Sequence, residues 1–401
     1  MVKIAHVTTI YLPGATARDT GALALDQRKR GWEVEIFTGR QASLELIQER
    51  RSQGTPITQI PCLRKYVHPL DDFKTILKLS RIFKAKNFDV VHTHLAKAGI
   101  IGRLAAVMAG IKKIIHTTHG ASFAPTLPPI TYYTYLNLEK LAGKFTDRFL
   151  FVGQDIRNAY VKAGVCPREK TFVSYVPKDL SPFLPVATLP EVERQERRQK
   201  AGIDPETIVL GNISRLVPWK GHEYGLRLLS ELKKDFGKIK YIIVGAPRVP
   251  VEMPHWDYLI NLAKSLGVFH DVVFAGWQTD TPYFYSLFDI YLITSMPFEG
   301  LSLSLLEATA ADLPIVGFDC YGTREVLGEN ANIVPPKDLG ALVQAVKREI
   351  ARLPESRRQR GKNITRIMKL QERHSLPRRL KEHAELYQAL LGNHNVSLLN
   401  R

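Results

Sequence analysis

Two kinds of hydrophobic pattern alternate along the first half of the chain: short, nearly continuous apolar runs, and longer segments in which apolar residues recur every three or four positions. The short runs predict strands that are buried on both faces, and the longer segments predict amphipathic helices. The predicted strands are 3–10, 33–39, 88–94, 113–120 and 148–153, and the predicted helices are 20–31 and 98–111. Such an alternation is typical of an α/β fold with a parallel, doubly wound sheet.

This alternation breaks between Pro182 and about Pro205, where prolines precede the charged run EVERQERRQK. That composition predicts a linker with a surface helix. The alternation then restarts, with strands predicted at 208–214, 240–245, 272–277, 290–295 and 314–319 and helices at 222–236, 256–266 and 303–311. Two domains of this style place a cleft between them, at the carboxyl ends of both sheets.

We therefore expect two Rossmann-like, doubly wound domains that face each other across a cleft. Residues 1–183 form the first domain and residues 206–375 the second, with 184–205 as the linker. The segment SLPRRLKEHAELYQALLG predicts an amphipathic helix, expected at about 376–395 and packed back on the first domain. A length of 401 residues, too long for one typical domain, agrees with two.

Composition is that of a globular protein from a reducing compartment. Hydrophobic residues make up 45% and charged residues 24% of the chain, as in ordinary soluble domains. The segment MVKIAHVTTIYLPG reaches Pro-Gly too early for a signal peptide, and no stretch approaches the ~20 apolar residues of a membrane span. The three cysteines are far apart, without metal-like or redox-like spacing. We expect a cytoplasmic protein.

Charge narrows the choice of partners. The chain has 56 Lys and Arg against 39 Asp and Glu, which gives a net charge of +17. Such a surplus indicates anionic partners, namely nucleic acid, phosphorylated substrates or an anionic membrane surface. The sequence contains no RNP signature, no zinc-finger spacing and no dominant basic tail, so we expect no nucleic acid. A basic nucleic-acid-binding protein stays open as an alternative at this point.

A loop with two cations follows the first strand of the second domain. In the stretch ISRLVPWKGHE, Arg215 and Lys220 lie between a predicted strand and a predicted helix, where a ligand phosphate would bind. Arginine grips a phosphate with two parallel N–H groups, and lysine contributes a compact charge. Two solvated loop cations are an equally good interpretation of this loop taken alone.

Two acids, Glu299 and Glu307, stand eight positions apart around an apolar run that contains serines. Eight helical steps turn a side chain about 80° beyond two full turns, so the two acids would not share a helix face. We expect Glu299 in a loop, Ser302 or Ser304 as the helix cap, and Glu307 in the first turns of the helix. The free N–H groups at such a helix start favour anions. The alternative is a solvated acid beside an ordinary cap.

In combination these motifs resemble those of the retaining GT-B glycosyltransferases of family 4, also called glycosyl transferases group 1. The chain carries SRLVPWKG, then EGLSLSLLE, then EATAADLPIVGFDCYGTREVL, in the order of the family's second-domain motifs. The resemblance extends to PGATARDTGALALDQRKRGWEVEIFTG and DVVHTHLAKAGIIGRLAA in the first half and to the C-terminal helix. It therefore covers nearly the whole chain. The tandem motifs are specific for the family and name no substrate.

The resemblance implies an enzyme that moves a hexosyl group from a UDP- or GDP-linked sugar donor to a glycan or lipid-linked acceptor, with retention of configuration. It implies a role in cell-surface polysaccharide, lipopolysaccharide or glycolipid synthesis. The first domain would bind the acceptor and the second the nucleotide sugar. No cofactor is implied. A peripheral place on the inner face of the membrane would suit a lipid-linked acceptor, and a GT-B nucleotide-sugar epimerase is the alternative enzyme.

The same resemblance assigns the donor-binding residues. Arg215 and Lys220 would neutralise the diphosphate, and Glu307 would accept hydrogen bonds from the ribose hydroxyls. Backbone N–H groups that would help with the diphosphate belong to Leu301, Ser302 and Leu303. Gly14, in the first glycine-bearing loop, would permit close approach of the ligand. The chain departs from the family at YVPKD (175–179), where an Asn-Gly turn is usual, and in having Ser302 where glycine is common.

Two residues are assigned by the resemblance to the reaction centre. Glu299 would bind hydroxyls of the transferred sugar, and His119, in IIHTTHGASF, would reach the same sugar. A strand-end histidine satisfied by backbone is the plain alternative for His119. The chain has no Asp-x-Asp motif, so no metal-bound nucleotide site is expected, although His92 and His94 on one face of a strand could chelate a metal. The family's favoured mechanism is front-face attack, in which the leaving phosphate helps to remove the acceptor proton.

One further segment bears on the membrane. The stretch DDFKTILKLSRIFKAKNF (71–88) has helical spacing, with an apolar face and a basic face. The apolar face comprises Phe73, Ile76, Leu77 and Phe83, and the basic face Lys74, Lys78 and Arg81. This pattern predicts either an ordinary surface helix or a helix that docks the first domain on anionic lipid.

Overall fold

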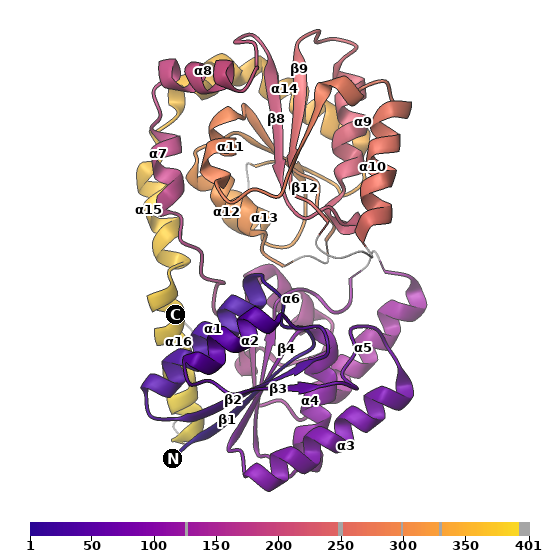
Figure 1. The fold of residues 1–401 in the computed structure, drawn as a ribbon, viewed down its shortest axis with the longest axis vertical. Helices are drawn as coiled ribbons and strands as arrows, with labels where there is room; N and C mark the ends of the chain where they lie inside the picture. The colour runs from indigo at the N-terminus through magenta and orange to yellow at the C-terminus, as the bar shows by residue number, and fades with distance from the viewer. Residues whose placement is uncertain (125–126, 248–251, 298–299, 329–330, 393–401) are drawn as a thin grey trace. The chain divides into compact units, whose positions relative to one another are not determined.

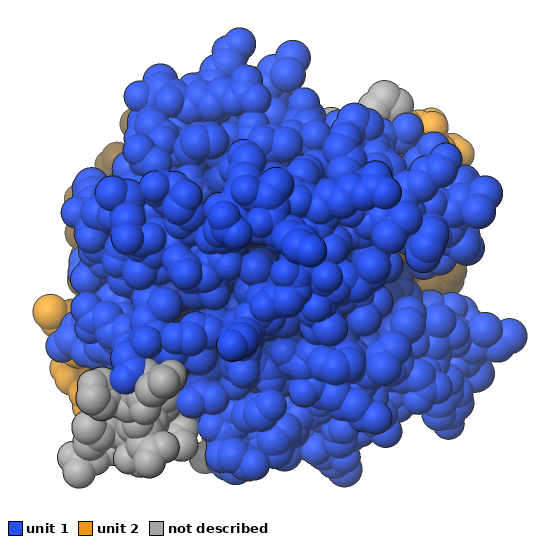
Figure 2. All heavy atoms as spheres, turned by 90° about the horizontal axis from the view of Figure 1, so that it is seen from below, with its two compact units in different colours: residues 1–177, 374–401 blue, residues 178–373 orange. Residues whose placement is uncertain are grey.

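The computed structural model describes residues 1–124, 127–247, 252–297, 300–328 and 331–392. The chain forms two compact units, which Figure 2 distinguishes by colour. Each unit has helices packed around one parallel sheet (Figure 1). Unit 1 combines Met1–Pro177 with His374–Arg401, and unit 2 is Lys178–Arg373. Within the described ranges, no helix is both long enough and apolar enough to cross a membrane.

The described residues of unit 1 form a seven-stranded sheet in the order β3-β2-β1-β4-β5-β6-β7. The strands are β1 (Lys3–Thr8), β2 (Glu33–Gly39), β3 (Ile57–Ile60), β4 (Val90–His94), β5 (Lys113–Thr118), β6 (Arg148–Phe151) and β7 (Thr171–Val173). The strand order reverses between β1 and β4, where Thr8 pairs with His94. Ligands of doubly wound sheets bind beside such a switch point, at the carboxyl ends of the strands.

Helices cover both faces of this sheet (Figure 1). They are α1 (Ala15–Lys29), α2 (Leu44–Ser52), α3 (Pro69–Lys86), α4 (Ala96–Met108), α5 (Pro129–Gly143), α6 (Gln154–Lys162) and α16 (Leu376–Leu391). Successive strand residues enter opposite cores: Ile36 and Val90 belong to one hydrophobic cluster, and Phe37 and Val91 to another. This two-sided burial is why the strands read as continuous apolar runs.

Helix α16 attaches the far end of the chain to unit 1. Arg379 is buried, and its Nε and Nη2 donate to the two carboxylate oxygens of Asp19 in α1 at 2.5 and 2.6 Å. Burial raises the pKa of Asp19, but the charge and hydrogen bonds of Arg379 outweigh burial and leave that pKa lowered. Tyr387 is also buried, and its hydroxyl lies 2.7 Å from His92 Nδ1. A bidentate, charge-assisted pair and a core tyrosine together fix the helix.

The described residues of unit 2 form a six-stranded sheet in the order β10-β9-β8-β11-β12-β13. The strands are β8 (Ile208–Ile213), β9 (Ile239–Val244), β10 (Val272–Gly276), β11 (Ile290–Ile293), β12 (Ile315–Phe318) and β13 (Asn332–Val334). The helices are α7 (Leu184–Ala187), α8 (Glu191–Lys200), α9 (His222–Leu232), α10 (Met253–Ser265), α11 (Thr281–Leu287), α12 (Leu303–Ala310), α13 (Thr323–Leu327), α14 (Leu339–Gln359) and α15 (Ile364–Arg373). Here the switch point lies between β8 and β11.

The predicted fold class is confirmed, because the strands expected from apolar runs coincide with observed strands and all pair in parallel. Strands β3, β7 and β13 were not predicted. Strands β7 and β13 have only three residues each, and β3 (ITQI) has polar residues at its two central positions, so none of them shows an apolar run.

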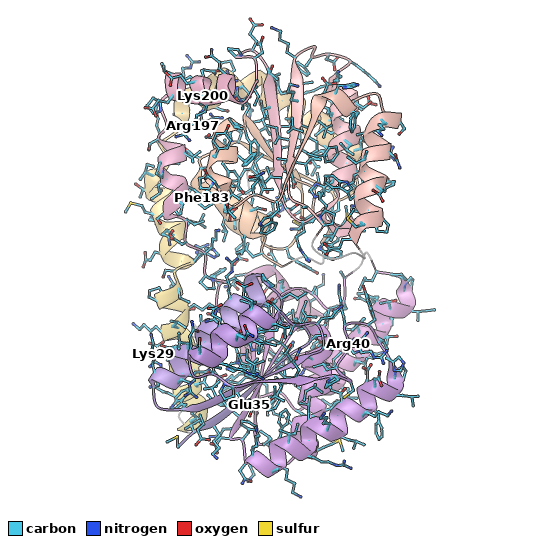
Figure 3. The ribbon with its side chains drawn as sticks, in the orientation of Figure 1. Lys29, Glu35, Arg40, Phe183, Arg197 and Lys200 are labelled. Atoms are coloured by element: carbon cyan, nitrogen blue, oxygen red, sulfur yellow. The ribbon has the colours of Figure 1, made fainter. Side chains whose placement is uncertain are left out.

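The observed division of the chain differs from the predicted one at the segment 184–205. That segment was expected to be a linker, but its helix α8, marked by Arg197 and Lys200 in Figure 3, packs against α11 inside unit 2. Arg198 is fully buried, and its Nη2 donates to Asp289 Oδ2 at 2.5 Å. The charged run EVERQERRQK therefore contains buried arginines, and composition alone does not distinguish these from solvated arginines.

The buried face of helix α3 is not the apolar face that was predicted for this segment. Leu79 and Phe83 are buried against the core of unit 1, whereas Phe73 is 60% exposed. The packed face is therefore rotated from the expected one and begins further along the helix. The basic side chains of α3 are exposed: Lys74, Lys78 and Arg81.

Candidate active site

The loop after β8 carries Arg215 and Lys220 and is anchored to the end of β11. Lys220 ends the short 3-10 turn Pro218–Lys220, and its carbonyl oxygen accepts a hydrogen bond from Thr294 Oγ1 at 2.8 Å. Gly221 then has a φ of 65°, and a Cβ at this position would lie 2.2 Å from the Thr294 carbonyl oxygen. Because only glycine fits such an approach, the Lys-Gly pair is fixed by packing beside the switch point.

The two cations of this loop differ in exposure. The Arg215 side chain is 40% exposed, its Nη1 lies 3.6 Å from Glu252 Oε1, and its guanidinium lies 5.4 Å from the centre of the Trp219 ring. Lys220, in contrast, is 8% exposed. Arg215 therefore offers an accessible planar fork oriented by an aromatic face, and Lys220 offers a buried, compact charge.

His222, directly after this loop, is a residue that the sequence analysis did not single out. It is fully buried, and its Nε2 lies 3.0 Å from Ser214 Oγ and 3.2 Å from the Arg215 carbonyl oxygen. Burial lowers the pKa of His222 to about 3, so the ring is neutral at physiological pH. His222 thus connects the start of the cation loop to the start of α9 by hydrogen bonds. Its position directly after the Lys-Gly pair is the feature of the sequence that could have identified it.

Helix α12 begins at Leu303 with Ser302 in the cap position. The expected capping bond is not made, because the Ser302 hydroxyl lies 3.1 Å from Ser304 Oγ and does not bond to the helix backbone. Leu301 and Ser302 are buried and Leu303 is partly exposed. The helix start thus lies where the sequence placed it, and the binding of phosphate by its N–H groups stays a prediction.

Glu307 lies in α12 and is 7% exposed. Its Oε2 accepts a hydrogen bond from the Tyr285 hydroxyl at 2.9 Å, and its Oε1 forms an ion pair with Lys178. Burial, together with the Glu307 charge, raises the pKa of Tyr285 well above its usual value, so Tyr285 remains a donor. Phe183, labelled in Figure 3, packs edge-on against Tyr285 with ring centres 5.4 Å apart.

Lys178 and Tyr285 were missed by the sequence analysis. Lys178 lies in YVPKD, so the departure from the family's Asn-Gly turn was a signal for it. Tyr285 carried no signal, because nothing in a sequence links it to a carboxylate 22 positions away. Together the two residues surround Glu307 with a cation and a hydroxyl donor.

Glu299, one of the predicted site residues, lies outside the residues that the structure describes. Gly14 caps the start of α1 with an extended backbone, and a Cβ there would meet only the Leu12 carbonyl oxygen, at 3.8 Å. Within the described structure, neither backbone conformation nor packing requires glycine at this position. A close-approaching ligand remains the predicted reason for it.

His119 follows β5 and is partly exposed. Its Nε2 lies 3.2 Å from His94 Nδ1, so its described partner is a side chain and not the backbone considered in the sequence analysis. Burial lowers the pKa of His119 to about 4, against an opposing effect of the Asp19 charge. His119 is therefore neutral near pH 7. The neutral ring can hydrogen-bond a sugar hydroxyl, but it does not supply a positive charge to stabilise a phosphate.

The H-x-H pair belongs to a group that was considered as a metal chelate. Ring nitrogens of His6, His92 and His94 all lie within 4.8 Å of one another. Both nitrogens of His92 are already used, however, since Nδ1 lies 2.7 Å from the Tyr387 hydroxyl and Nε2 2.7 Å from Thr117 Oγ1. The hydrogen bonds account for the arrangement of His92 without a metal.

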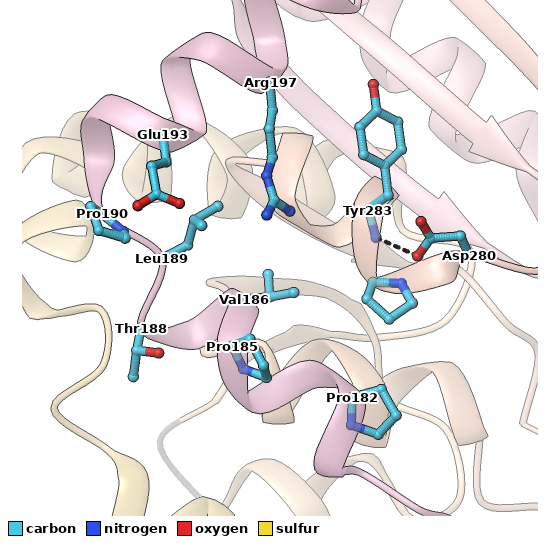
Figure 4. A pocket seen from close by; sticks show the side chains of 11 residues that line it. Pro182, Pro185, Val186, Thr188, Leu189, Pro190, Glu193, Arg197, Asp280 and Tyr283 are labelled. Carbon is cyan, nitrogen blue, oxygen red and sulfur yellow. Dashed lines mark hydrogen bonds between the residues drawn. The ribbon is translucent and has the colours of Figure 1, made fainter.

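A hollow of about 610 Å³ in unit 2 does not coincide with these residues (Figure 4). It is lined by the turn Ser181–Phe183 and by α7, α8 and α11, and none of the predicted donor-binding residues lines it. The Asp280–Tyr283 bond drawn there, 3.3 Å from the Tyr283 N–H nitrogen to Asp280 Oδ1, is the cap of α11. We therefore assign the candidate site to the loops beside β8 and β11.

Comparison with protein families agrees with this assignment. The family model described as Glycosyl transferases group 1 matches residues 193–366, which include Arg215, Lys220 and Glu307. The model described as Glycosyltransferase Family 4 matches residues 17–180, which include His119. The two matches together cover most of the chain.

Individual proteins show the same relationship. UDP-Gal:alpha-D-GlcNAc-diphosphoundecaprenol alpha-1,3-galactosyltransferase of Escherichia coli is 25% identical over 368 residues, covering 86% of this chain and 87% of that protein. GDP-mannose-dependent alpha-(1-6)-phosphatidylinositol monomannoside mannosyltransferase of Mycolicibacterium smegmatis is 26% identical over 263 residues, covering 63% of this chain and 64% of that protein.

Solved structures extend the relationship to the fold. The crystal structure of HepE from Anabaena in complex with UDP-glucose has a TM-score of 0.75 at 19% identity, and covers 97% of this chain and 100% of that chain. Sucrose-phosphate synthase of Thermosynechococcus elongatus has a TM-score of 0.76 at 18% identity, and covers 98% of this chain and 100% of that chain. The motifs, the two family models and the paired Rossmann-like sheets lead to one conclusion: the chain belongs to the GT-B glycosyltransferases of group 1, of the family 4 type.

Proposed function

We propose that the protein transfers a hexosyl group from a nucleotide-sugar donor to a glycan or lipid-linked acceptor, with retention of configuration and without a metal ion. The observation that carries this proposal is the arrangement in unit 2, where two cations on the β8 loop and a buried carboxylate on α12 follow adjacent strands. Arg215 and Lys220 bind the diphosphate, assisted by N–H groups at the start of α12. Glu307 binds the ribose hydroxyls.

Charge decides which ligand group each side chain meets. A diphosphate is repelled by a carboxylate and attracted by Arg215 and Lys220, so Glu307 must meet hydrogen-bond donors. In the described structure its two oxygens meet Lys178 and Tyr285. We infer that ribose hydroxyls displace Lys178 from Oε1 while Tyr285 keeps Oε2 in place. A hydrogen bond to a charged group contributes about 1.5–3 kcal/mol, enough to compete with a partly exposed ion pair.

The reaction breaks the bond between the anomeric carbon and the leaving phosphate oxygen. The acceptor hydroxyl oxygen bonds to that carbon on the same face, and its proton passes to the departing diphosphate. Arg215 and Lys220 stabilise the charge that develops on the leaving group, in place of a divalent cation. Glu299 and His119 bind the transferred sugar, and the backbone at Gly14 permits its close approach.

Donor and acceptor classes are supported by the relatives. The Escherichia coli protein is named as a transferase that uses UDP-Gal and a diphosphoundecaprenol-linked sugar, and the Mycolicibacterium protein as one that uses GDP-mannose and a phosphatidylinositol mannoside. We propose a UDP- or GDP-linked hexose as donor and an acceptor on a polyprenyl or phospholipid anchor. The product would belong to a cell-surface polysaccharide or glycolipid.

A lipid-linked acceptor calls for contact with a membrane, and unit 1 has a suitable surface. At the start of α3, Leu70 is 71% exposed beside the exposed Phe73. The basic face of α3 (Lys74, Lys78 and Arg81) follows directly. Ile130 and Tyr133 of α5, which like α3 packs on α4, are also exposed. Exposed apolar groups next to cations favour an anionic lipid surface, and we propose peripheral binding at the cytoplasmic face.

The test is a panel of UDP-, GDP- and ADP-hexoses with the purified protein, in the presence of EDTA and of an acceptor extracted from membranes. We expect one donor to yield a free nucleoside diphosphate and a glycosylated lipid whose new bond has the donor's anomeric configuration. Complete loss in EDTA that Mg²⁺ or Mn²⁺ restores would contradict the metal-free site. An inverted product would contradict retention, and conversion of the donor to its epimer without transfer would identify an epimerase.

A further inference from the structure

Five histidines lie together inside unit 1, and we call them the histidine cluster: His6, His92, His94, His119 and His383. The rings of His92 and His94 have centroids 4.2 Å apart, and the other neighbouring pairs are 5.1 to 6.1 Å apart. His119 is partly exposed and the other four are buried. The cluster thus leads from the interior to the carboxyl edge of the sheet.

Three hydrogen bonds connect part of this cluster in a line that begins at Gln27 of α1. Gln27 Oε1 lies 2.8 Å from His6 Nε2. His6 Nδ1 lies 2.9 Å from His94 Nε2, and His94 Nδ1 lies 3.2 Å from His119 Nε2. Every ring in the line except the last therefore uses both nitrogens.

The direction of the line is set at its buried end. A neutral imidazole has one N–H and one lone pair, so each bond in the line needs one donor and one acceptor. The Gln27 amide oxygen can only accept, so His6 carries its proton on Nε2 and accepts at Nδ1. His94 must then donate from Nε2 and accept at Nδ1, and His119 must donate from Nε2. The lone pair of His119 is left on Nδ1.

Two further observations support this reading of the line. Burial lowers the pKa values of His6 and His119 to about 4 and that of His94 well below its usual value, so the rings are neutral. The Gln27 amide oxygen, and not its nitrogen, is the atom 2.8 Å from His6 Nε2, so the amide presents an acceptor to the first ring of the line.

We propose that Gln27, His6 and His94 are positioning residues that hold His119 as its Nε2–H tautomer, so that His119 meets a hydroxyl of the transferred sugar with an accepting Nδ1. A carboxylate fixes the histidine of a hydrolase triad in the same way. The assignment of the sugar to His119 rests on the proposed function, whereas the tautomer does not. A sugar hydroxyl would then have to donate to His119, which selects the orientation of the donor.

The tautomers are measured directly on the whole protein labelled with ¹⁵N-histidine, by long-range ¹H–¹⁵N correlation, with signals assigned by single His→Gln variants. We expect Nε2–H forms for His6, His94 and His119. An Nδ1–H form at any of the three would overturn the proposal. So would coordination shifts of these nitrogens on addition of stoichiometric Zn²⁺, because the line would then be a metal site.

Two variants at the start of the line connect the tautomer with activity. Gln27→Leu removes the acceptor and would leave a buried His6 Nε2–H without a partner, so the line should reverse and the Nδ1–H form of His119 should predominate. The value of kcat/KM for the donor should then fall about ten-fold, the loss of one hydrogen bond to the sugar. Gln27→Glu keeps an acceptor oxygen, so it should retain the Nε2–H form and stay within about three-fold of the wild-type kcat/KM. The affinity for bare nucleoside diphosphate should not change in either variant.

Equal losses in the two variants, or a Gln27→Leu protein that has the Nδ1–H form of His119 and full activity, would overturn the proposal. If Gln27→Leu does not fold, the wild-type tautomers and the Gln27→Glu kinetics still decide. A wild-type protein with the expected tautomers but no sugar transfer would refute the proposed function and leave the Nε2–H assignment of the line supported.

Discussion

Acid should unfold unit 1 before unit 2, because unit 1 contains the histidine cluster. Burial lowers the pKa of His6 to about 4 and those of His92, His94 and His383 well below 6.5. In the unfolded chain each of these groups titrates near 6.5. As the pH falls below 6.5 the unfolded state binds more protons than the native state. The stability they contribute is therefore fully present above about pH 6.5 and is lost towards pH 4.

The magnitude follows from these shifts. For one histidine with a native pKa of about 4, the free energy of unfolding is about 2 kcal/mol lower at pH 5 than at pH 7.5. His6 is fully buried, so little of that value is lost to solvent screening, whereas the partly exposed His119 contributes less. The pKa values of His92, His94 and His383 are lowered in the same direction by burial and by the neighbouring histidines, so these residues add to the loss of stability from His6.

Unit 2 should respond less over the same range. Its strongly shifted histidine is His222, with a pKa lowered to about 3, which corresponds to a loss of about 2 kcal/mol at pH 5. Burial lowers the pKa of His255 as well, but that residue is only partly buried. Burial raises the pKa of Glu223, which acts in the opposite sense because the native state then binds the proton first.

The assay is urea unfolding at pH 7.5, 6.5, 5.5 and 5, followed by tryptophan fluorescence. Trp32 belongs to unit 1, where its ring centre lies 5.7 Å from that of Tyr387, and the other tryptophans belong to unit 2. Comparison with a Trp32→Phe variant therefore separates the two units. We expect the midpoint of unit 1 to fall steeply between pH 6.5 and 5, with an unchanged m-value.

His383→Leu is the matched control, because neither ring nitrogen of His383 has a hydrogen-bond partner among the described residues. It removes one protonation site and breaks no described hydrogen bond. The pH slope for unit 1 should decrease by about one proton, or about 1.4 kcal/mol per pH unit between pH 6 and 5. A unit 1 midpoint that is the same at pH 7.5 and 5, or earlier unfolding of unit 2, would refute the reasoning.

Four further outcomes are expected. Glu307→Gln should weaken binding of bare nucleoside diphosphate about ten- to a hundred-fold in calorimetry. Glu299→Gln should leave that affinity unchanged and lower kcat. Equal affinities in the two variants would mean that both carboxylates are misassigned. Lys178→Met should strengthen nucleotide binding several-fold by removing the competitor at Glu307, and weaker binding would contradict displacement by ribose. Gly14→Ala should keep the melting temperature and lower kcat/KM, because space for a Cβ exists in the protein but not beside a bound ligand; unchanged activity would show that no ligand comes close. Charge reversal across the basic face of α3 should abolish sedimentation with anionic vesicles at low salt, and sedimentation that persists would exclude this face as the membrane contact.

Local patterns in the sequence predicted the parts of the fold that depend on local physics. The strand predicted at 33–39 is β2, because a strand buried on both faces must be apolar at nearly every position. The cation loop was predicted for a similar reason, since Lys220 and Gly221 lie between a strand and a helix that both show clear periods. In contrast, β13 has three residues and no period, and was found only through its pairing with β12.

The residues that the sequence did not reveal are those whose partners are distant in the chain. Asp19 and Arg379 are 360 positions apart, and Gln27 reaches His6 from another element. The H-x-H spacing showed that His92 and His94 share a face of one strand, but it did not show whether that face met a metal, water or further histidines. Buried arginines in α8 gave the same difficulty, because a charged run has one composition whether it is solvated or buried.

The path of the chain through the two units has a consequence for biosynthesis. Unit 1 takes its last helix from residues after His374, whereas unit 2 is one continuous stretch, Lys178–Arg373. A ribosome therefore completes unit 2 while the nascent unit 1 still lacks Arg379 for Asp19 and Tyr387 for His92. Until α16 emerges, Asp19 and the hydrophobic cluster that Leu386 and Tyr387 complete remain uncovered. Emergence of α16 from the ribosome, and not completion of the first half, is then the step at which the N-terminal sheet becomes stable, and a chain that stops short of α16 would leave unit 1 as a substrate for chaperones and proteases.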